Sequence, residues 1–472
     1  MIKGILKSDK AISKELFILS LPIILSNVSR VAMELIDMIM INRLGEINWF
    51  NGVSMGGIIV WVPMALAIGI RMATQTISSR RYGEEDYSGC GFALRHGLII
   101  AFIMGTIFSL FGYLGSSSII PLLLSNDGLQ KDATIAYSKY LSIGILPFYL
   151  SIIFQGFFNS IEKTKIHMKV AITSNILNVY LNAGLIFGYA RLSSSLDNFG
   201  IGFANNLWFW APQEAWTVKG SAIATTISTI FMLLYYIYYL FEDDIIKKYS
   251  ILKMAIKRNK LKSHFHLAYP VIISELFLST SYLFFYLVLE SIGQEELAAW
   301  TLIIRLAHAS FMPAIGLGQG CATMVGKYLG KKDLPSATKS INEGVRQALL
   351  LMGSIGLIFI IFAEPIIGLF NILEGPEKYA ILGLRFCGIF QIFDAICIIL
   401  YFSMSAGGDV RFPAYTEILM HWIVMVPISW LFGIYLGFGF WGALSVFGIQ
   451  TIATAIIFTL RVNTGKWKKI EV

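Results

Sequence analysis

The chain has 472 residues, of which 56% are hydrophobic and only 14% are charged, and its mean hydropathy is +0.68. Soluble domains carry about 25% charged residues, so the composition excludes an ordinary soluble protein. The formal net charge of +8 would suggest nucleic-acid binding in a soluble protein, but in a membrane protein basic loops on one face account for it. We therefore expect no nucleic-acid partner.

Twelve apolar stretches follow one another along the chain. A helix needs about 20 apolar residues to cross the hydrocarbon core of a bilayer, and each stretch is long enough. The predicted spans are 15–41, 50–77, 93–114, 137–159, 167–190, 218–241, 266–291, 296–325, 345–370, 379–404, 412–436 and 439–461. The sequence thus predicts an all-α polytopic membrane protein with twelve transmembrane helices.

An internal repeat divides the chain into two pseudo-symmetric halves. The segment GIRMATQTISSRRYGEED at 69–86 resembles GLGQGCATMVGKYLGKKD at 316–333, with matching Gly, Thr, Gly and Asp positions. Six helices separate equivalent points, so the halves should insert with the same orientation. We expect an N-terminal six-helix bundle at 1–242, a basic cytoplasmic linker at 243–265 and a C-terminal six-helix bundle at 266–472.

Basic residues predict how the chain is oriented. Lys and Arg are retained in cytoplasmic loops, and seven of them lie in the linker between 247 and 262. The loops on the same side as the linker, together with both chain ends, hold most of the others. We therefore expect an integral protein of the plasma (inner) membrane, surrounded by lipid, with both termini in the cytoplasm.

Ionisable groups at bilayer depth cost about 3 kcal/mol or more each on insertion scales, so each requires a partner or a role. In the first span, Asn27, Arg30, Glu34 and Asp37 recur at spacings that place them on one helix face. Arg30 and Glu34 can pair with each other, which makes a structural ion pair as good an interpretation as a cavity role for Glu34. Asp37 has no partner within its own helix and is a candidate cation-coupling residue.

Two more carboxyls lie inside predicted spans of the second half. Asp394 occupies the middle of CGIFQIFDAICIILYF, with Gln391 one turn before it and no basic residue in the run. An isolated carboxyl of this kind suits a proton carrier and also a Na⁺ ligand. Glu275 shares a helix face with Tyr282. We take Asp394 and Glu275 as candidate coupling residues and Na⁺ ligands, and Gln391 and Tyr282 as candidates for the substrate cavity.

Further polar residues are cavity candidates with a structural alternative. Arg305 and His308 lie on one stripe of their helix, where a cation could face the carboxyls of the 266–291 or 379–404 span; simple neutralisation explains Arg305 equally well. Asn178 and Asn182 are four residues apart and could bind a carboxyl on the first helix, although such amides often only join helices.

Two features are expected to be ordinary. Glu417 and His421 are four residues apart, but we place them near the cytoplasmic end of their helix and treat them as minor candidates. The 191–217 segment is the longest predicted outer loop, and its tryptophans are expected at the membrane interface.

Enzyme signals are missing from the sequence. GCATMVGKY lacks the first glycine of a phosphate loop and has Tyr328 where Ser or Thr should coordinate Mg²⁺. No HExxH or GxSxG pattern occurs, and the four cysteines show no CxxC spacing, so they read as small core residues. We expect a transporter without a bound cofactor rather than an enzyme.

With these residues in view, the chain resembles the multidrug and toxic compound extrusion (MATE) family, of the bacterial NorM and DinF kind. The resemblance rests on LPIILSN and LIDMIMINRLG in the first helix, RLAHASFMPAIGLGQGCATMVGKYLG in the eighth and DAICIILYFSMSAGGDVRFP in the tenth. It implies two six-helix bundles that exchange H⁺ or Na⁺ for organic, often cationic, amphipathic compounds, in a protein that works as a monomer.

The resemblance also assigns residues. Asp37 and Asp394 match the family's acids in helices 1 and 10, and Asn178 matches its helix-5 asparagine. Asn182 stands where some members have Asp, and Glu275 lies one turn before the glutamate of the Na⁺-coupled branch. H⁺ and Na⁺ therefore both remain candidate coupling ions.

Two alternatives stay open at this point. A related lipid-linked oligosaccharide flippase would need a more cationic cavity, for which only Arg30, Arg71, Arg305 and Arg385 could serve, each in the company of carboxylates. An exporter of one specific metabolite, such as a siderophore, would show the same sequence pattern.

Overall fold

The computed structural model describes residues 8–124, 128–198, 200, 202–242, 244–252, 258–370 and 374–471. In this part of the chain eleven helices are long and apolar enough to cross a membrane, and a bent helix pair at Leu129–Ser160 makes a twelfth span. The predicted twelve-helix, all-α fold is confirmed.

The helices of the first half run from α2 to α9. They are α2 (Lys10–Asn42), α3 (Ile47–Ala65), α4 (Ala67–Gly83), α5 (Tyr87–Leu123), α6 (Leu129–Ile143), α7 (Ile145–Ser160), α8 (Thr164–Asn198), η1 (Gly202–Trp208) and α9 (Thr217–Glu242). Helices α3 and α4 together form one span, and α6 and α7 form the pair that bends by 49°.

The second half follows the short helix α10 (Ile245–Lys248). It comprises α11 (Arg258–Ile292), α12 (Gln294–Gly330), α13 (Leu334–Ile361), α14 (Ala363–Gly368), α15 (Glu374–Ala406), α16 (Arg411–Leu419), η2 (Met420–Met425), α17 (Val426–Trp430), η3 (Leu431–Tyr435), α18 (Gly439–Asn463) and η4 (Lys466–Lys469). The elements η2 and η3 are π-helical, so one span contains two wide turns.

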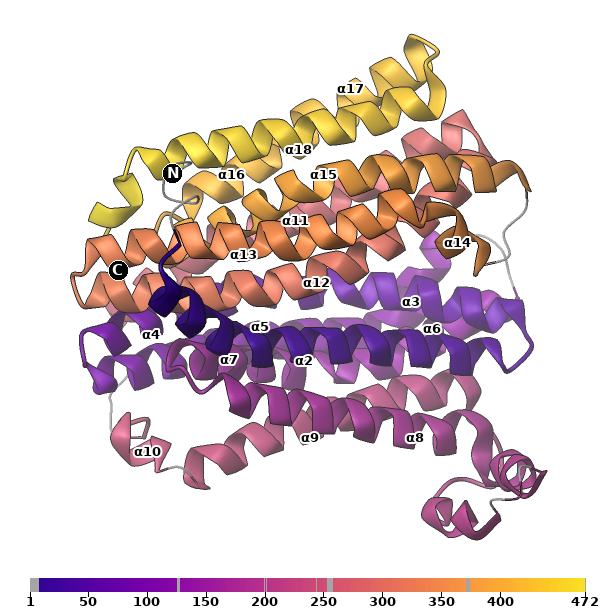
Figure 1. The fold of residues 1–472 in the computed structure, drawn as a ribbon. Coiled ribbons are helices and arrows are strands. Elements are labelled where there is room, and N and C mark those ends of the chain that lie inside the picture. The colour runs from indigo at the N-terminus through magenta and orange to yellow at the C-terminus, as the bar shows by residue number, and fades with distance from the viewer. Residues whose placement is uncertain are drawn as a thin grey trace.

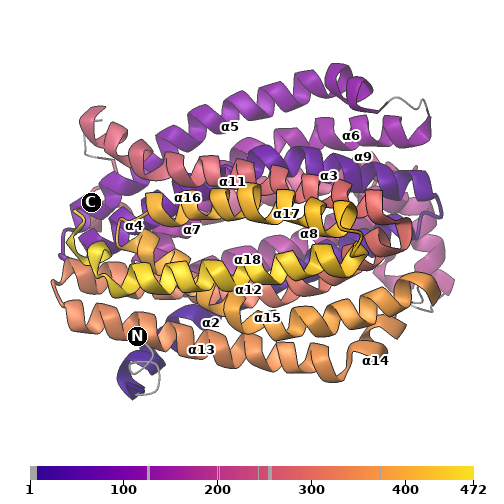
Figure 2. The ribbon, with the colours of Figure 1, turned by 90° about the horizontal axis from the view of Figure 1, so that it is seen from above.

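All the long helices run in roughly the same direction, and both chain termini lie at one end of the molecule, together with α10 (Figure 1). We call this the terminus end; α14 and η1 lie at the opposite end. Seen from above, the long helices again lie roughly along one direction (Figure 2). The two halves contact each other mainly where α2 meets α12 and where α4 meets α11 and α12, and we call this contact the central seam.

The repeated motif has a physical explanation in the structure. Its final aspartate begins a helix in each half: the Asp86 carboxylate accepts a bond from the backbone N–H of Gly89 at 2.9 Å, and Asp333 accepts from Ser336 N–H at 3.0 Å. An aspartate in this position satisfies a backbone donor that the first turn leaves free. The repeat therefore marks the same turn between helices in both halves.

The motif's helices also form the contact between the halves. A Cβ atom on Gly316 of α12 would lie 2.9 Å from the backbone nitrogen of Ile24 in α2, and one on Gly83 of α4 would collide with the backbone of Lys327. Since real Cβ atoms do not approach so closely, glycine is what allows these backbones to meet. The two halves are thus packed tightly near the terminus end.

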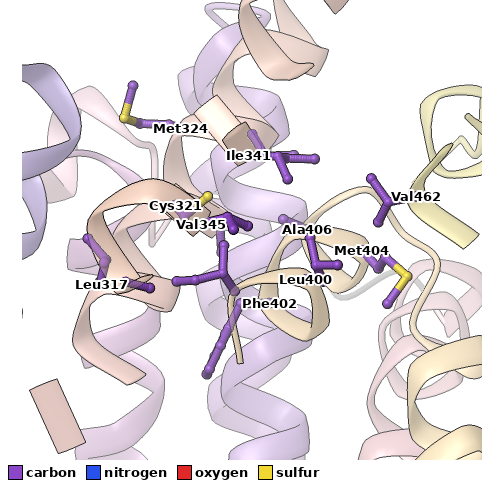
Figure 3. Packing of buried hydrophobic residues seen from close by; sticks show 14 of the residues in the cluster. Leu317, Cys321, Met324, Ile341, Val345, Leu400, Phe402, Met404, Ala406 and Val462 are labelled. Carbon is purple, nitrogen blue, oxygen red and sulfur yellow. The ribbon is translucent and has the colours of Figure 1, made fainter. Parts of the chain in front are cut away.

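Much of the core of the second half is shared by α12, α13, α15 and α18. Figure 3 shows Cys321 of α12 beside Val345 of α13, with Leu400 and Phe402 of α15 packed next to them. All four cysteines are free thiols; Cys90, Cys321 and Cys387 are buried and Cys397 is half-buried. Their predicted role as small core residues is confirmed.

Part of the 191–217 segment, which we predicted as the longest outer loop, is helical in the structure. Helix α8 continues through it to Asn198, with a break at Gly188, whose φ of 72° suits glycine. Beyond the break this part of α8 and η1 project from the bundle at the opposite end (Figure 1).

Two of the segment's tryptophans are held by α8. The indole N–H of Trp208 donates to the carbonyl of Tyr180 at 3.0 Å, and that of Trp210 to the Tyr180 hydroxyl at 2.6 Å. The helical residues 191–198 and 202–208 within this segment were not predicted from the sequence. The interfacial position of these rings stays a prediction.

Candidate functional site

A cavity of about 580 Å³ lies between the two halves. Its lining residues come from α2, α3, α4, α7, α8 and α9 on one side, and from α11, α12, α15, α16, η2 and α18 on the other. Pockets of this volume accommodate drug-sized molecules. We call the first side the N-wall and the second the C-wall.

Three carboxyl groups from three helices gather on the C-wall. Glu275 of α11, Asp394 of α15 and Glu417 of α16 all line the cavity. In the described part of the chain neither Glu275 nor Asp394 has a Lys, Arg or His nitrogen within 4 Å. The structure therefore brings the two predicted coupling acids of the second half together and adds a third.

Glu417 and His421 correct the expectation that they are ordinary residues near a helix end. His421 is buried, and its Nδ1 lies 3.4 Å from a carboxylate oxygen of Glu417 and 2.8 Å from the Glu417 carbonyl. Gln450 of α18 lies 3.4 Å from the other ring nitrogen. Because α16 begins at Arg411 and enters a π-helical turn at Met420, both side chains reach the cavity. Their spacing of four residues was the available signal.

The N-wall carries cations where the C-wall carries acids. Arg71 of α4 is buried and donates to the Gln75 side-chain oxygen at 3.1 Å. Arg30 of α2 lies 6.0 Å above the Trp61 ring and 3.0 Å from the sulfur of Met312, while its distance to the Glu34 carboxylate is 3.9 Å. The predicted pairing of Arg30 with Glu34 is thus at the limit of an ion pair.

Buried amides close the cavity towards the terminus end. Gln75 of α4 donates to the Gln319 carbonyl at 2.9 Å and to the Thr323 hydroxyl at 3.1 Å. Asn159 and Gln155, both from α7, approach the Gln319 side-chain oxygen at 3.3 and 3.4 Å. These bonds join the two halves on the side of the cavity that faces the terminus end. These contacts could not be predicted from the sequence, because each partner is an ordinary amide or hydroxyl whose role appears only where the two halves meet.

A second set of contacts between the two halves, made by charged groups, lies nearer the terminus end. The Lys327 ammonium of α12 binds the carboxylates of Glu15 at 2.7 Å and Glu162 at 2.5 Å, and the Tyr328 hydroxyl donates to Glu15 at 2.7 Å. Both acids belong to the first half. The halves are therefore held together by charge as well as by packing at this end.

Asp37 lies apart from this cavity. Its carboxylate accepts a bond from the Asn182 amide at 2.6 Å; the same amide donates to Asn178 at 3.0 Å, and Asn178 donates to Thr225 of α9 at 3.2 Å. The expected meeting of Asp37 with the amides of α8 is found. Asp37 and Asp394 belong to different halves, and only Asp394 lines the cavity.

The remaining candidates divide into three groups. Tyr282 and His308 line the cavity. Gln391 is buried and accepts a bond from the Ser310 hydroxyl at 2.8 Å, which joins α15 to α12. Glu34 and Arg305 are exposed and lie outside the lining, so Arg305 does not face the acids of α11 or α15 as we expected.

The described residues contain no group of three or more His, Cys, Asp or Glu side chains spaced to hold a metal ion. Glu275 and Asp394 line the same cavity, but they do not belong to a cluster of three or more such side chains that could by itself surround a Na⁺ ion. A coupling cation at this wall would therefore draw on other oxygen atoms as well.

Comparison with known proteins identifies the chain. The sequence model of the MatE family matches residues 22–183 and again 270–431, one copy in each half. The chain belongs to the MatE family. The two matched segments begin 248 residues apart, which agrees with the repeat seen in the sequence.

Relatives of this MatE protein are similar over nearly their whole length. The probable multidrug resistance protein NorM of Thermotoga maritima is 24% identical over 464 residues, which cover 97% of this chain and 94% of the relative. The probable NorM protein of Pseudomonas putida is 24% identical over 458 residues, covering 94% and 93%.

Solved structures agree in fold. An outward-facing multidrug resistance MATE transporter of the MOP superfamily matches with a TM-score of 0.84 at 19% identity, covering 98% of this chain and 100% of that one. A MOP superfamily transporter from Pyrococcus furiosus matches with a TM-score of 0.83 at 19% identity over the same shares. This MatE protein is an integral membrane transporter and not an enzyme.

Proposed function

We propose that this MatE protein is an antiporter that exports organic, cationic, amphipathic compounds in exchange for H⁺ or Na⁺. The observation that carries the proposal is the C-wall: Glu275, Asp394 and Glu417 present three carboxyls to a drug-sized cavity between two halves. Relatives named as probable multidrug resistance proteins support a broad set of substrates.

The mechanism follows from competition for this charge. A coupling cation at Asp394 or Glu275 neutralises the site and releases a cationic substrate, and the neutral state then permits the halves to rock. Asp37 forms a second cation site within the first half, where its amide partners hold the carboxylate in place. Substrate and cation each favour one state of the transporter, which couples their movements.

The conformation and the basic loops support an assignment of which end of the protein lies in the cytoplasm. The cavity is closed at the terminus end by the amides around Gln319 and by Lys327. The terminus end also carries most of the Lys and Arg residues of the loops, which places it in the cytoplasm. In this assignment the structure is outward-facing and the protein lies in the plasma membrane.

The test is transport of ethidium in proteoliposomes under a Na⁺ gradient and, separately, a pH gradient. Asp394→Asn and Asp37→Asn should each reduce exchange by at least about tenfold, since each removes a charge that a coupling cation must find. Glu290→Gln is the matched control, because Glu290 is an exposed acid at the far end of α11. Normal export by both Asp variants would contradict the proposal.

The flippase alternative has less support. Of the four arginines that could serve a pyrophosphate, only Arg30 and Arg71 line the cavity. Arg385 binds Glu364 at 2.8 Å outside the cavity, and Arg305 is exposed. Two cations facing three carboxyls do not make the strongly cationic cavity that a lipid pyrophosphate would need.

A further inference from the structure

A second cavity, of about 900 Å³, lies near the terminus end of the protein. In the first half its lining comes from the end of α4 and the start of α5. In the second half it comes from the start of α11, the turn between α15 and α16, the start of α16 and the residues after η4. None of these residues lines the cavity between the N-wall and the C-wall. We call this second cavity the terminal pocket.

A buried histidine of α5, His96, lines the terminal pocket and is only 1% exposed. Its Nδ1 lies 2.8 Å from the carbonyl oxygen of Phe92, and since a carbonyl only accepts, this nitrogen donates. Its Nε2 is buried and has no hydrogen-bond partner in the described part of the chain. A buried polar atom without a partner is costly, so His96 offers a contact for a polar group of a ligand.

A second buried histidine, His264 of α11, lies against α5, since a Cβ atom on Gly97 would be 3.5 Å from its Cε1. The Thr74 hydroxyl donates to the Ile70 carbonyl at 2.9 Å. The Nε2 of His264, 3.1 Å from the same hydroxyl oxygen, is therefore the donor to it. Because this bond joins α11 to α4, the buried part of the terminal pocket is built by both halves together.

Two exposed cations of the lining lack an acidic partner. Lys260 of α11 and Arg411 of α16 have no carboxylate oxygen within 4 Å among the described residues. Arg411 donates instead to Nε2 of His266 at 2.6 Å, and a ring nitrogen that accepts in this way carries no proton. The third cation of the lining, Arg81, binds Glu84 at 2.6 Å. The pocket thus presents two positive charges that are not held in ion pairs.

Three acids also belong to the lining, and two of them are already engaged. The Asp86 carboxylate caps α5 and accepts from the Ser88 hydroxyl at 2.8 Å. Asp409 binds Arg461 through two bonds of 2.8 and 3.1 Å. Glu471, after η4, is exposed. Among the described lining residues it is the one acid left to oppose the two cations, so the pocket favours an anion.

We propose that the terminal pocket binds a phosphate group, with Lys260 and Arg411 bound to its oxygens and Nε2 of His96 in contact with it. A phosphate has more oxygens than a carboxylate, enough for a guanidinium fork and an ammonium at once. It also suits either form of His96. Phosphate oxygens accept from a protonated Nε2, and the hydroxyl of a singly protonated phosphate donates to a neutral one. A lipid headgroup and a soluble phosphate share this chemistry.

A phosphate in the terminal pocket contacts both halves, because His96 belongs to the first half and Lys260 and Arg411 belong to the second. A ligand stabilises the state that it binds best. A bound phosphate therefore favours the state in which the terminus end is closed. The terminal pocket is a regulatory site, separate from the cavity that takes the transported compound.

Isothermal titration calorimetry of the purified full-length protein, in an uncharged detergent, tests the site. The probes are inorganic phosphate, dioctanoyl phosphatidic acid and dioctanoylglycerol, and the two lipids differ only in the phosphate. Binding of phosphatidic acid alone would support a lipid headgroup as the ligand, and comparable binding of inorganic phosphate would support a soluble one. Failure of both to bind, or equal binding of dioctanoylglycerol, would overturn the inference.

Variants of exposed residues locate the binding. Lys260→Gln and Arg411→Gln should each weaken it by about tenfold, because each removes a charge-assisted hydrogen bond. Lys262→Gln is the matched control: Lys262 is an exposed cation of the same helix outside the lining, and its loss should change the affinity by less than about twofold. Glu471→Gln should tighten binding by about two- to threefold, because it removes the opposing charge. An equal loss in Lys262→Gln, or wild-type affinity in both Lys260→Gln and Arg411→Gln, would overturn the inference.

Two further measurements test the buried contact and the bridging of the halves. His96→Leu should weaken binding, and His96→Gln, whose amide both donates and accepts, should recover part of the loss. Amide hydrogen exchange should slow at the start of α5 and at the start of α11 when the ligand binds. Slowing in only one half would refute the bridging, and equal binding by His96→Leu and wild type would refute the contact. None of these measurements depends on ion-driven export.

Discussion

Lys327 offers the sharpest test of how the two halves are held together. Its ammonium joins α12 to two acids of the first half, Glu15 at 2.7 Å and Glu162 at 2.5 Å, and its side chain is only 13% exposed. Replacing it by Met removes both ion pairs and leaves two carboxylates without their cation. We predict that Lys327→Met favours the state in which the terminus end is open.

The magnitude follows from burial. Exposed ion pairs contribute about 0–1 kcal/mol and buried ones cost about 3–5 kcal/mol to break, and these partly exposed pairs lie between, at about 2–3 kcal/mol for both together. That energy corresponds to about a 30- to 150-fold change in the equilibrium between the two states. An open population of about 1% would rise to about 20–60%.

The assay is electron–electron distance measurement between spin labels at the terminus end. Labels at Lys165 of α8 and Lys331 after α12 report on the two halves, since both positions are exposed. The four native cysteines are replaced by alanine in this background. Wild type should give one short distance, and Lys327→Met should add a longer one.

The controls make the reasoning refutable. Lys169→Met removes an exposed cation of the same end and should leave the distances unchanged. In a Glu15→Gln, Glu162→Gln background, Lys327→Met should have little further effect because its partners have already lost their charge. An unchanged distance distribution in Lys327→Met, or an equal change in the background lacking both acids, would refute the role of these ion pairs.

Three further predictions concern stability, each measured as the melting temperature of the purified protein in detergent. Gly316→Val should destabilise the seam by about 1–3 kcal/mol because its side chain meets the α2 backbone, whereas Gly353→Val, with open space around its Cβ position, should not; equal effects would contradict the packing argument. Asp409→Asn should cost about 2–3 kcal/mol, since the buried carboxylate binds Arg461 through two bonds of 2.8 and 3.1 Å, and a neutral result would refute the importance of that pair. Asp333→Ala should cost about 1 kcal/mol, equally at pH 7 and pH 5. Hydrogen bonds at the α13 N-terminus hold the pKa of Asp333 below its usual range, so the stabilisation is lost only as the pH falls through that lowered pKa. A loss of the effect already at pH 5 would contradict this explanation.

The sequence was sufficient to predict the architecture because membrane crossing is a local property. Each span depends on about 20 consecutive apolar residues, and all twelve predicted spans coincide with helices in the structure. The repeat was visible for a similarly local reason, since the same turn with its capping aspartate occurs in both halves. Neither feature required knowledge of which helices are neighbours.

The site was predictable only where one residue was conspicuous by itself. Asp394 and Glu275 are carboxyls in apolar runs, and the structure places both in the cavity. Glu417 was underestimated because its depth depends on how its helix packs and turns. Arg305 was overestimated for the complementary reason: its stripe of the helix is polar, but the fold leaves it exposed.

The two π-helical segments in the span from Arg411 to Tyr435 have a consequence for motion. A π turn closes its hydrogen bonds one residue later than an α turn, and each residue of an α-helix advances about 100° around the axis. Conversion of one such turn to α geometry would rotate the part of the helix that follows it by about 100° around the helix axis, relative to the part that precedes it. His421 lies inside the first of these segments and Glu417 just before it. Glu417, before the first segment, and the residues after Met425 would then no longer keep the same orientation relative to each other around the helix axis.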